Sequence, residues 1–576
     1  MVIINNKYNK KLTYILSRSV ILVAVMIAAG CSNDETDTVS DITAVETLAT
    51  ETPSVEKKIE EPMVIETPVV KTPFIETKPV EAQVTKTPSE QKMATEDRVV
   101  ETPVVKTPIF KTLPRATRTI ESSIAESKAD KTTKGNASNT NTSNENASNE
   151  NTDSELDENK SSKSKLRNDI AKDYDANLNA LFKHFHANPE LSFKEFETAK
   201  RLASEIRALG YDVTEGVGQT GIVAVLKNGE GPTVMLRADM DGLPVLEDTG
   251  LDYASKARQV SVDGQEKPVM HACGHDVHIT SLVGTARQLI ARKDAWSGTL
   301  VLIGQPAEER ISGAKAMIED GLYTRFPKPD YALAFHVSSQ TPAGKIVLNE
   351  GLAYSSSDAV DITVHGVGAH GASPHLGRDP VLIASQIVVS LQSIVSRSIA
   401  PLQPGVITVG SIHGGTKNNI ISDRVEMQLT VRSDDPEVRA ALLDGIDRVA
   451  KGVALSHGIP EDKLPTVTRR KESTPPTKNT GSTARIIKAA FKAKMGEEVI
   501  LEQPRTGMGA EDFAYFVDPK HGVKGVYFGV GGTPFNELEN AASHHSPFFK
   551  VSPEPSVKLG TEAMVVAAMT LFETKE

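Results

Sequence analysis

The chain is organised around one short stretch, Met270-His271-Ala272-Cys273-Gly274-His275-Asp276-Val277-His278, which places three histidines, one cysteine and one aspartate within nine residues. A thiolate and an imidazole two residues apart can share a pair of adjacent metal ions, and these ligands favour zinc-like metals over calcium or magnesium. A lone cysteine or histidine is more often a core residue than a ligand. The density of such groups here, with further acidic and imidazole groups downstream, favours a metal site.

Those downstream groups follow apolar, strand-like runs. Residues 298–303 lead into Gln305-Pro306-Ala307-Glu308-Glu309, and residues 331–336 end in a histidine. Two adjacent glutamates at a strand end point in different directions, so one can bind metal while the other faces the substrate as a proton carrier. An acidic strand end, 239–241, lies upstream, and His544-His545 lies near the C-terminus. Groups at the carboxyl ends of several strands are the expected layout of an α/β active site.

The pattern of apolar residues predicts an α/β fold. Over residues 166–356, strands alternate with amphipathic helices, which implies a sheet covered by helices on both faces. Over residues 357–465, three strands and two long helices indicate a smaller α+β unit, after which residues 466–576 return to the first domain. The predicted helices are 195–209, 277–292, 312–320, 380–398, 435–453 and 479–495, and the predicted strands include 221–226, 233–237, 360–364, 406–409 and 425–432.

Six motifs resemble those of the peptidase M20 family, and more closely its amidohydrolase branch, which includes hippurate hydrolases, N-acetyl-diaminopimelate deacetylases and auxin-conjugate hydrolases. The resemblance covers about residues 168–573. It implies a metal-binding α/β catalytic domain with an inserted smaller α+β lid or dimerisation domain. In chain order the motifs are Arg237-Ala-Asp-Met-Asp-Gly-Leu-Pro244, His271-Ala-Cys-Gly-His-Asp-Val-His278, Gln305-Pro-Ala-Glu-Glu309, Gly366-Val-Gly-Ala-His-Gly-Ala-Ser-Pro-His375, Gly509-Ala-Glu-Asp-Phe513 and His545-Ser-Pro547.

The resemblance also implies a metal-ligand set. It would hold two divalent ions per subunit, with zinc as the first choice and manganese, cobalt or nickel as alternatives. Such ions lie roughly 3.5–4 Å apart. Cys273 falls on the bridging position. The ligand positions are occupied by Cys273, His275, Glu309, His336 and His545.

Catalytic and substrate-binding roles follow from the same resemblance. Glu308 falls on the general base that takes a proton from the attacking water and returns it to the leaving amine. His370 resembles the lid histidine that donates to the oxyanion, in some relatives from the other subunit. Asn419 and Arg432 match positions that hold the substrate carboxylate. An arginine on a strand can also form an ordinary surface ion pair, so that alternative stays open for Arg432.

Three further polar residues are predicted to support or surround the site, and a fourth is predicted to take no part in it. Asp241 is expected to orient a metal ligand through a hydrogen bond. His271 and His278 are expected either to support the ligands through contacts of their own or to pack beside them, and not to bind metal. His544 is expected to be a bystander, because strand geometry would turn its ring away from the side that His545 faces.

The N-terminus indicates export. A basic segment precedes the apolar residues 20–29, which are too few to span a bilayer. Ala28-Ala29-Gly30-Cys31 resembles a bacterial lipoprotein signal, so residues 1–31 are predicted to be the signal peptide and Cys31 the lipid anchor. The protein would then sit at the cell envelope, in the outer membrane and periplasm of a Gram-negative cell. An ordinary cleaved signal and an uncleaved anchor are the alternatives.

Residues 32–165 are predicted to be a disordered tether. Glu66-Thr-Pro-Val-Val-Lys-Thr-Pro73 recurs nearly intact as Glu101-Thr-Pro-Val-Val-Lys-Thr-Pro108, and an Asn/Ser-rich segment follows. Frequent proline prevents helix and favours extended chain. The tether would be a stalk that lifts an enzyme off the membrane, or an arm that binds a partner.

The net charge of −11 argues against nucleic acid as a partner, because phosphate binding needs a basic face. The resemblance implies a metal-dependent amidohydrolase that cleaves the amide bond of an N-acyl or N-aminoacyl amino acid, or of a short peptide, and a homodimer formed through the lid. A dipeptidase or carboxypeptidase of the same family is the alternative enzyme. A lipoprotein that binds N-acyl amino acids without turnover is disfavoured by Glu308, because a binding protein needs no proton carrier.

Overall fold

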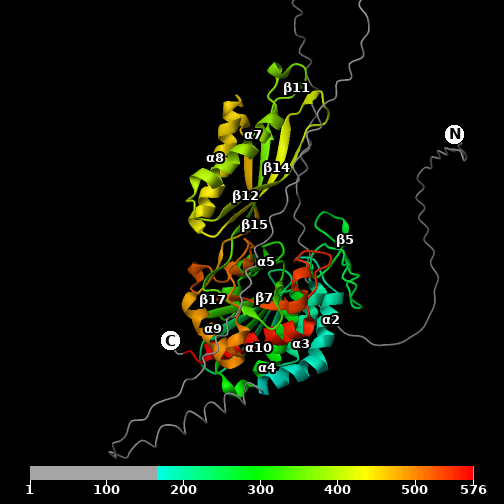
Figure 1. Cartoon of the computed structure of the whole chain (residues 1–576), viewed down its shortest axis with the longest axis vertical. Helices are drawn as coiled ribbons and strands as arrows, with labels where there is room; N and C mark the ends of the chain where they lie inside the picture. Colours follow the sequence, from blue (N-terminus) through cyan, green and yellow to red (C-terminus); the bar gives the residue numbers. More distant parts are fainter. Residues whose placement is uncertain (1–164, 575–576) are drawn as a thin grey trace, which may run out of the picture. The chain divides into compact units, whose positions relative to one another are not determined.

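The computed structural model describes residues 165–574, in which helix begins at residue 165. The predicted signal peptide, the Cys31 anchor and the tether up to residue 164 lie outside this range. Within it, two sheets organise the chain (Figure 1).

A mixed seven-stranded sheet forms the catalytic part, in the order β1-β2-β6-β3-β7-β17-β8. The four central strands run parallel, while β1, β2 and β8 pair antiparallel with their neighbours. Central parallel strands are buried on both faces, which is why their sequences are nearly continuous apolar runs. The strands are β1 (Asp212–Val217), β2 (Gly221–Asn228), β3 (Thr233–Asp239), β6 (Gly298–Gln305), β7 (Tyr331–Pro342), β8 (Ile346–Val347) and β17 (Lys524–Thr533).

Alternating side chains of this sheet build two separate cores. In β3, Val234 and Leu236 pack in one core and Met235 in the other, because successive side chains point to opposite faces. The first core is covered by α2 (Asn179–Ala187), α3 (Phe196–Arg207), α4 (His275–Ile290), α9 (Gly481–Met495) and α10 (Pro553–Phe572), and the second by α5 (Gly313–Glu319), α6 (Leu322–Arg325) and the turn Asp512–Tyr515. The predicted α/β sheet with helices on both faces is confirmed. The sequence pattern had not resolved β17 or α10.

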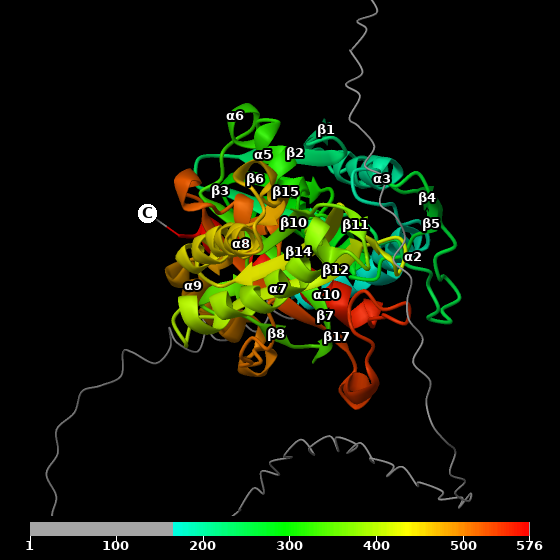
Figure 2. The same ribbon diagram turned by 90° about the horizontal axis from the view of Figure 1, so that it is seen from above.

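A four-stranded antiparallel sheet with two helices on one face forms a second unit, which we call the lid (Figure 2). The buried positions of its strands alternate, so one face packs against the helices and the other stays exposed. Both helices begin with an aspartate cap followed by proline, a strong start signal. The elements are β12 (Gly405–Gly414), β14 (Arg424–Ser433), β10 (Ser357–His365) and β15 (Thr466–Thr474), in sheet order, with α7 (Pro380–Ser393) and α8 (Pro436–Ser456).

The predicted end of the lid at residue 465 is too early. β15 pairs with β10 along most of its length, so the lid sheet continues to Thr474. β15 is an edge strand with mostly exposed polar side chains, and it therefore lacks the apolar alternation that marks a half-buried strand.

Three short antiparallel pairs complete the described elements. They are β4 (Arg258–Val260) with β5 (Glu266–Pro268), β9 (Gly351–Tyr354) with β16 (Thr477–Asn479), and β11 (Ala369–His370) with β13 (Ile420–Ile421). The β11–β13 pair lies in the connections beyond the last residue of β10 and the first of β14, at the end of the lid remote from Ser357 and Ser433. We call this pair the lid tip.

Among the described residues, one helical segment, Pro380–Ser398, is long and apolar enough to cross a membrane by length and composition alone. It comprises α7 and a following π-helical turn, and it buries Ile383, Ile387 and Leu391 against the lid sheet. The core helix of a globular domain can have the same length and composition, and the buried contacts of this segment show that it packs against the lid sheet.

Candidate metal centre and active site

The five predicted metal ligands lie together at one edge of the large sheet; we call them the Cys273 cluster. Donor atoms of Cys273, His275 and Glu309 lie within 4.8 Å of one another. The sulfur of Cys273 lies 3.5 Å from Nε2 of His336, and Nε2 of His545 lies 3.3 Å from Oε2 of Glu309. Cys273 therefore stands between two groups of donors, the place expected of a bridging thiolate. The ligand roles themselves stay predictions.

The start of α4 places the cysteine and the first histidine. Gly274 caps the helix with φ +86°, the left-handed region that favours glycine. A Cβ at this position would lie 2.3 Å from Cγ1 of Val337, so any other residue would also collide with β7. Gly274 thus lets the chain turn sharply between Cys273 and His275, so that both side chains reach the cluster.

The backbone orients two imidazoles of the cluster through Nδ1, so that Nε2 of each ring has no backbone partner. Nδ1 of His275 lies 2.8 Å from the carbonyl oxygen of Asp241, and Nδ1 of His336 lies 2.7 Å from that of Val337. A carbonyl oxygen only accepts, so in the neutral ring Nδ1 carries the hydrogen and Nε2 offers its lone pair. This is the tautomer that a metal ligand needs.

The cluster also contains buried polar atoms that fit a cation. Nε2 of His275 and Oε1 of Glu309 are buried, have no hydrogen-bond partner within the described range, and lie 3.9 Å apart. Burial alone would lower the pKa of His275, but Asp239 and Asp241 raise it to about 10. Burial raises the pKa of Glu309 to about 8. Unpaired buried polar atoms in a field of carboxylates are costly, and a bound cation would satisfy both.

Asp241 positions the two glutamates. Its Oδ1 accepts a hydrogen bond from the backbone N–H of Glu308, and its Oδ2 accepts one from that of Glu309, each at 3.1 Å. Ser192 donates to the same carboxylate at 2.6 Å. Asp241 therefore holds the Glu308–Glu309 turn in place, while its backbone carbonyl orients His275. Burial, with the charges of Glu511 and Glu309, raises the pKa of Glu308 well above its usual range.

A buried charge network lies next to the cluster and includes Arg237 and Asp239, for which the sequence motifs predicted no role. Arg237 is fully buried and donates to Asp239 at 2.6 Å, Glu511 at 2.7 Å and Gln305 at 2.8 Å. Asp239 in turn bonds Nδ1 of His278, whose Nε2 accepts from the backbone N–H of Val337. The signal was available: an arginine inside an apolar strand has to be paired when it is buried.

The prediction that His544 turns away from the site is wrong. Its Nδ1 lies 3.5 Å from the sulfur of Cys273, and its Nε2 accepts from the backbone N–H of Ser339 at 3.4 Å. His544 can therefore donate through Nδ1 to the Cys273 sulfur. The two histidines lie in a turn in which His545 has φ +67°, so the alternation of a strand does not apply and both rings face the cluster.

The predicted substrate-binding residues separate into two groups. Arg432 lines a cavity of about 500 Å³ together with Cys273, Glu308 and Tyr354, and we call it the Cys273 cavity. His370 and Asn419 lie at the lid tip, where the backbone N–H of Gly371 donates to the carbonyl of Asn419. Both are exposed, and neither lines this cavity. Since β10 has nine residues, the tip lies roughly 30 Å along the lid from Ser357.

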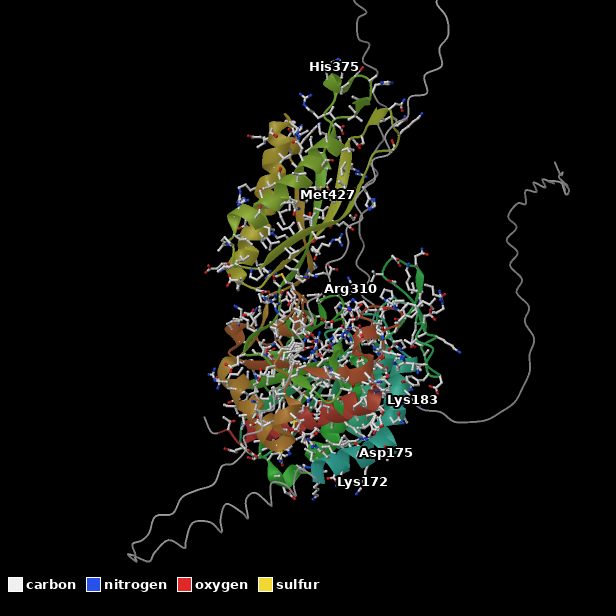
Figure 3. All side chains as sticks on the ribbon, viewed as in Figure 1. Lys172, Asp175, Lys183, Arg310, His375 and Met427 are labelled. Carbon is white, nitrogen blue, oxygen red and sulfur yellow. The ribbon has the colours of Figure 1, made fainter. Side chains whose placement is uncertain are left out.

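The catalytic part and the lid are joined by contacts near the cluster. Nη2 of Arg310, which is labelled in Figure 3, pairs with Glu472 of β15 at 3.0 Å. Arg505 pairs with Asp434, two residues beyond Arg432. These contacts tie the strand end that carries Arg432 to the catalytic part.

Comparison with known proteins places this site in a family. Residues 235–570 match the model of peptidase family M20/M25/M40. The chain belongs to this family. It is 38% identical to thermostable carboxypeptidase 2 of Saccharolobus solfataricus over 416 residues, which cover 70% of this chain and 98% of the relative. It is 37% identical to the hippurate hydrolase of Campylobacter jejuni over 371 residues, 63% of this chain and 92% of that enzyme.

A solved structure from Bacillus subtilis, described as a dinuclear metal-binding peptidase of the M20 family, superposes with a TM-score of 0.57 at 28% identity. The match covers 70% of this chain and all of that one. This M20 chain therefore has the fold of the metal-dependent peptidases and amidohydrolases, and its activity is hydrolysis of amide or peptide bonds.

Proposed function

We propose that this M20 protein hydrolyses the amide bond of N-acyl or N-aminoacyl amino acids that carry a free carboxylate. The observation that supports this most directly is Arg432, a cation that lines the same cavity as the ligand cluster and Glu308. Its Nη1 donates only to neutral oxygens, those of Ser357, Thr430 and Val431. Within the described part of the chain, no carboxylate forms an ion pair with it.

The carboxylate of Asp358, on the neighbouring strand β10, is already paired. Asp358 receives two hydrogen bonds from Arg439, at 2.7 and 2.8 Å. Arg432 therefore keeps donors on its guanidinium for an incoming anion, and a planar guanidinium suits a carboxylate with two parallel hydrogen bonds. A substrate carboxylate held there would place the adjacent amide within the Cys273 cavity.

The residues of the Cys273 cluster would hold two divalent ions, for which zinc is our first choice. When bound, such ions polarise the scissile carbonyl and make water a better nucleophile. Glu308 lies beside the cluster, with its Oε2 3.9 Å from Nε2 of His275. Its carboxylate takes a proton from the attacking water and delivers it to the leaving nitrogen. Asp241 fixes the Glu308 backbone, so the proton carrier is already oriented when substrate enters.

The lid tip supplies the remaining donor. Nδ1 of His370 accepts from the backbone N–H of Ala372 at 3.0 Å, so the hydrogen of the neutral ring is on Nε2, where it can be donated to an oxyanion. Because His370 and Asn419 are remote from the Cys273 cavity along their own lid, we propose that they serve the site of a second subunit in a homodimer. At the N-terminus, we propose that lipid on Cys31 anchors the enzyme to the cell envelope.

The decisive experiment is Glu308→Gln in the purified full-length protein. We expect hydrolysis of hippurate and N-acetyl amino acids to fall by about 10²–10⁴-fold, because the proton carrier is lost. Metal content, measured by mass spectrometry, should stay at the wild-type level. Glu497→Gln, on the surface, is the matched control and should retain activity. Undiminished turnover in Glu308→Gln would reject Glu308 as the base.

A peptidase activity is the second candidate, because the Saccharolobus relative is named a carboxypeptidase. Arg432 suits the C-terminal carboxylate of a peptide as well as that of an N-acyl amino acid. The wild-type protein should therefore be assayed on dipeptides beside the N-acyl substrates, and a higher kcat/KM on dipeptides would favour the peptidase.

A further inference from the structure

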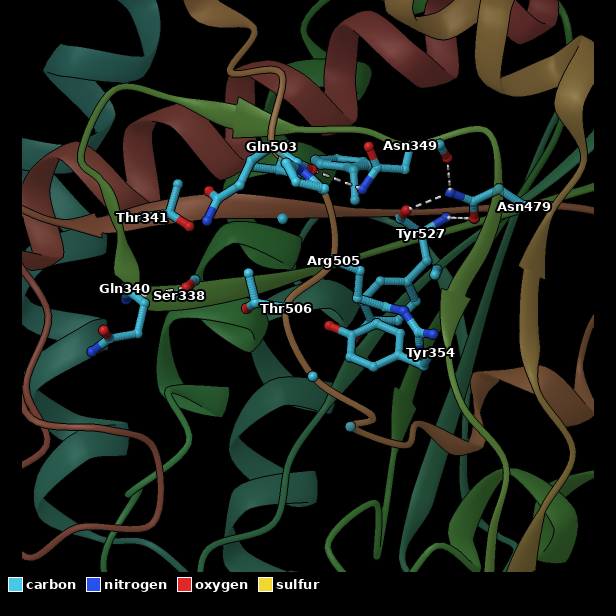
Figure 4. A pocket seen from close by; sticks show the side chains of 17 residues that line it. Ser338, Gln340, Thr341, Asn349, Tyr354, Asn479, Gln503, Arg505, Thr506 and Tyr527 are labelled. Carbon is cyan, nitrogen blue, oxygen red and sulfur yellow. Dashed lines mark hydrogen bonds between the residues drawn. The ribbon is translucent and has the colours of Figure 1, made fainter. Parts of the chain in front are cut away.

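A second cavity, of about 300 Å³, adjoins the Cys273 cavity (Figure 4). We call it the Asn349 cavity, after a residue that lines this cavity and not the Cys273 cavity. Four residues line both cavities, namely Ser338, Tyr354, Gly509 and Gly529. Two of these are glycines, so little side-chain volume separates the spaces. Arg432, Cys273 and Glu308 line only the first cavity.

The walls of the Asn349 cavity combine aromatic and apolar side chains with neutral polar ones, and the side-chain amides of Asn349 and Asn479 are already bonded. The rings of Tyr354 and Tyr527 meet edge to face at 5.1 Å. Asn479 donates to the carbonyls of Asn349 and Tyr527 at 2.8 and 2.9 Å and accepts from the N–H of Tyr527 at 2.7 Å. Asn349 donates to the carbonyl of Gln503 at 3.3 Å. These two amides shape the cavity, and its other polar side chains, such as Thr341, Gln503 and Thr506, are uncharged.

The cavity also has no free charge. None of its lining residues is an aspartate or glutamate, and its one cation is Arg505. That guanidinium is paired with Asp434 and donates to the hydroxyl of Ser355 at 2.6 Å. An ammonium group entering here would lose water without gaining a carboxylate partner, which is unfavourable.

Gly529 lines both cavities and lies where they adjoin. It lies in β17, where Phe528 and Val530 pack in one core and Tyr527 packs in the other, so a side chain at 529 would face the same side as Tyr527. Gly529 pairs with Val347 of β8, and an added Cβ would lie 3.6 Å from the Cβ of Val347, an ordinary contact. A larger side chain would project into the shared space.

We propose that the Asn349 cavity receives the acyl group of the substrate, that it selects an uncharged acyl group, and that Gly529 sets the upper limit on its size. This inference rests on the proposed amidohydrolase function. With the carboxylate at Arg432 and the scissile carbonyl at the Cys273 cluster, the acyl chain extends across the four shared residues. An uncharged N-acyl group then fits better than the free α-ammonium of a dipeptide.

The test uses the metal-loaded full-length protein with N-acetyl, N-propionyl, N-benzoyl and glycyl derivatives of one amino acid. Propionyl and glycyl groups have nearly the same shape but differ in charge, and wild type should prefer propionyl at least tenfold in kcat/KM. Gly529→Leu should lose at least tenfold in kcat/KM on the benzoyl substrate while changing less than threefold on the acetyl one. Gly529→Ala is the matched control and should stay near wild type on the acetyl substrate.

The outcomes separate the two proposals. If wild type hydrolyses no N-acyl amino acid, the proposed function fails and this inference fails with it. If wild type does hydrolyse them, equal effects of Gly529→Leu on the acetyl and benzoyl substrates would overturn the inference alone, as would a preference for glycyl over propionyl. Val347→Phe fills the same space from β8 and replaces Gly529→Leu if thermal melting shows that the leucine variant does not fold.

Discussion

The Cys273 cluster and the lid tip both carry predicted active-site residues, but their structural settings are opposite. The cluster stands on buried parallel strands, and its side chains are held by carbonyls and carboxylates of the same chain. The tip is a two-stranded pair with two paired residues on each strand, and His370 and Asn419 there are exposed. A two-stranded pair alone is marginal in water. One region is preorganised within the chain, whereas the other is exposed and, in our proposal, is completed only when a second subunit docks against it.

The strongest way to break the preorganised region is to remove the charge beneath it. Arg237→Met leaves Asp239, Glu511 and Asp512 without their shared cation in a fully buried position. Breaking a buried charge network from one side costs about 3–5 kcal/mol, so the free energy of unfolding should fall by that amount in denaturant titrations. Arg470→Met, which breaks the partly exposed pair with Asp361, is the control and should cost about 1 kcal/mol or less. Equal losses in the two variants would contradict the assignment of Arg237 as the support of the site.

A substitution at the exposed lid tip should lower enzymatic activity without changing metal content or stability. His370→Ala removes the proposed oxyanion donor, so kcat should fall about 10²–10³-fold while metal content and thermal stability stay unchanged. His413→Ala, another exposed lid histidine, is the control and should stay near wild type.

Mixing two inactive variants tests which subunit uses the tip. A dimer of one Glu308→Gln and one His370→Ala subunit contains one intact site if His370 acts across the interface, and none if it acts within its own chain. Random mixing should therefore restore about a quarter of wild-type activity, because half of the dimers are mixed. No recovery, with mixed dimers shown by native mass spectrometry, would contradict the proposal.

The same contrast explains what the sequence could and could not predict. Apolar runs such as 298–303 and 331–336 predicted the central strands correctly, and Glu309 and His336, which lie at or just beyond the ends of these runs, both have donor atoms close to the sulfur of Cys273. The rule of alternation failed for His544, because a turn with a left-handed residue replaces the strand there. The strand β15 was not predicted, because its exposed polar residues show no apolar alternation. In our proposal the tip docks on a second subunit, and no local sequence pattern encodes such a contact.

Arg432 belongs to the lid strand β14 yet lines the Cys273 cavity, so it gives the finest test of how the two regions work together. Arg432→Lys keeps the positive charge but removes the planar guanidinium, which can donate two parallel hydrogen bonds to a carboxylate. The loss of one of these hydrogen bonds should lower kcat/KM roughly tenfold. The same substitution should have no effect on substrates whose carboxylate is replaced by a carboxamide, because these lack the anion that the guanidinium binds. A tenfold loss on both substrate types would mean that Arg432 holds the lid strand through Ser357 and Thr430 and does not bind the substrate. In that case the carboxylate would have to be bound by Asn419 of the tip, and Asn419→Ala would then raise KM for the carboxylate substrates alone.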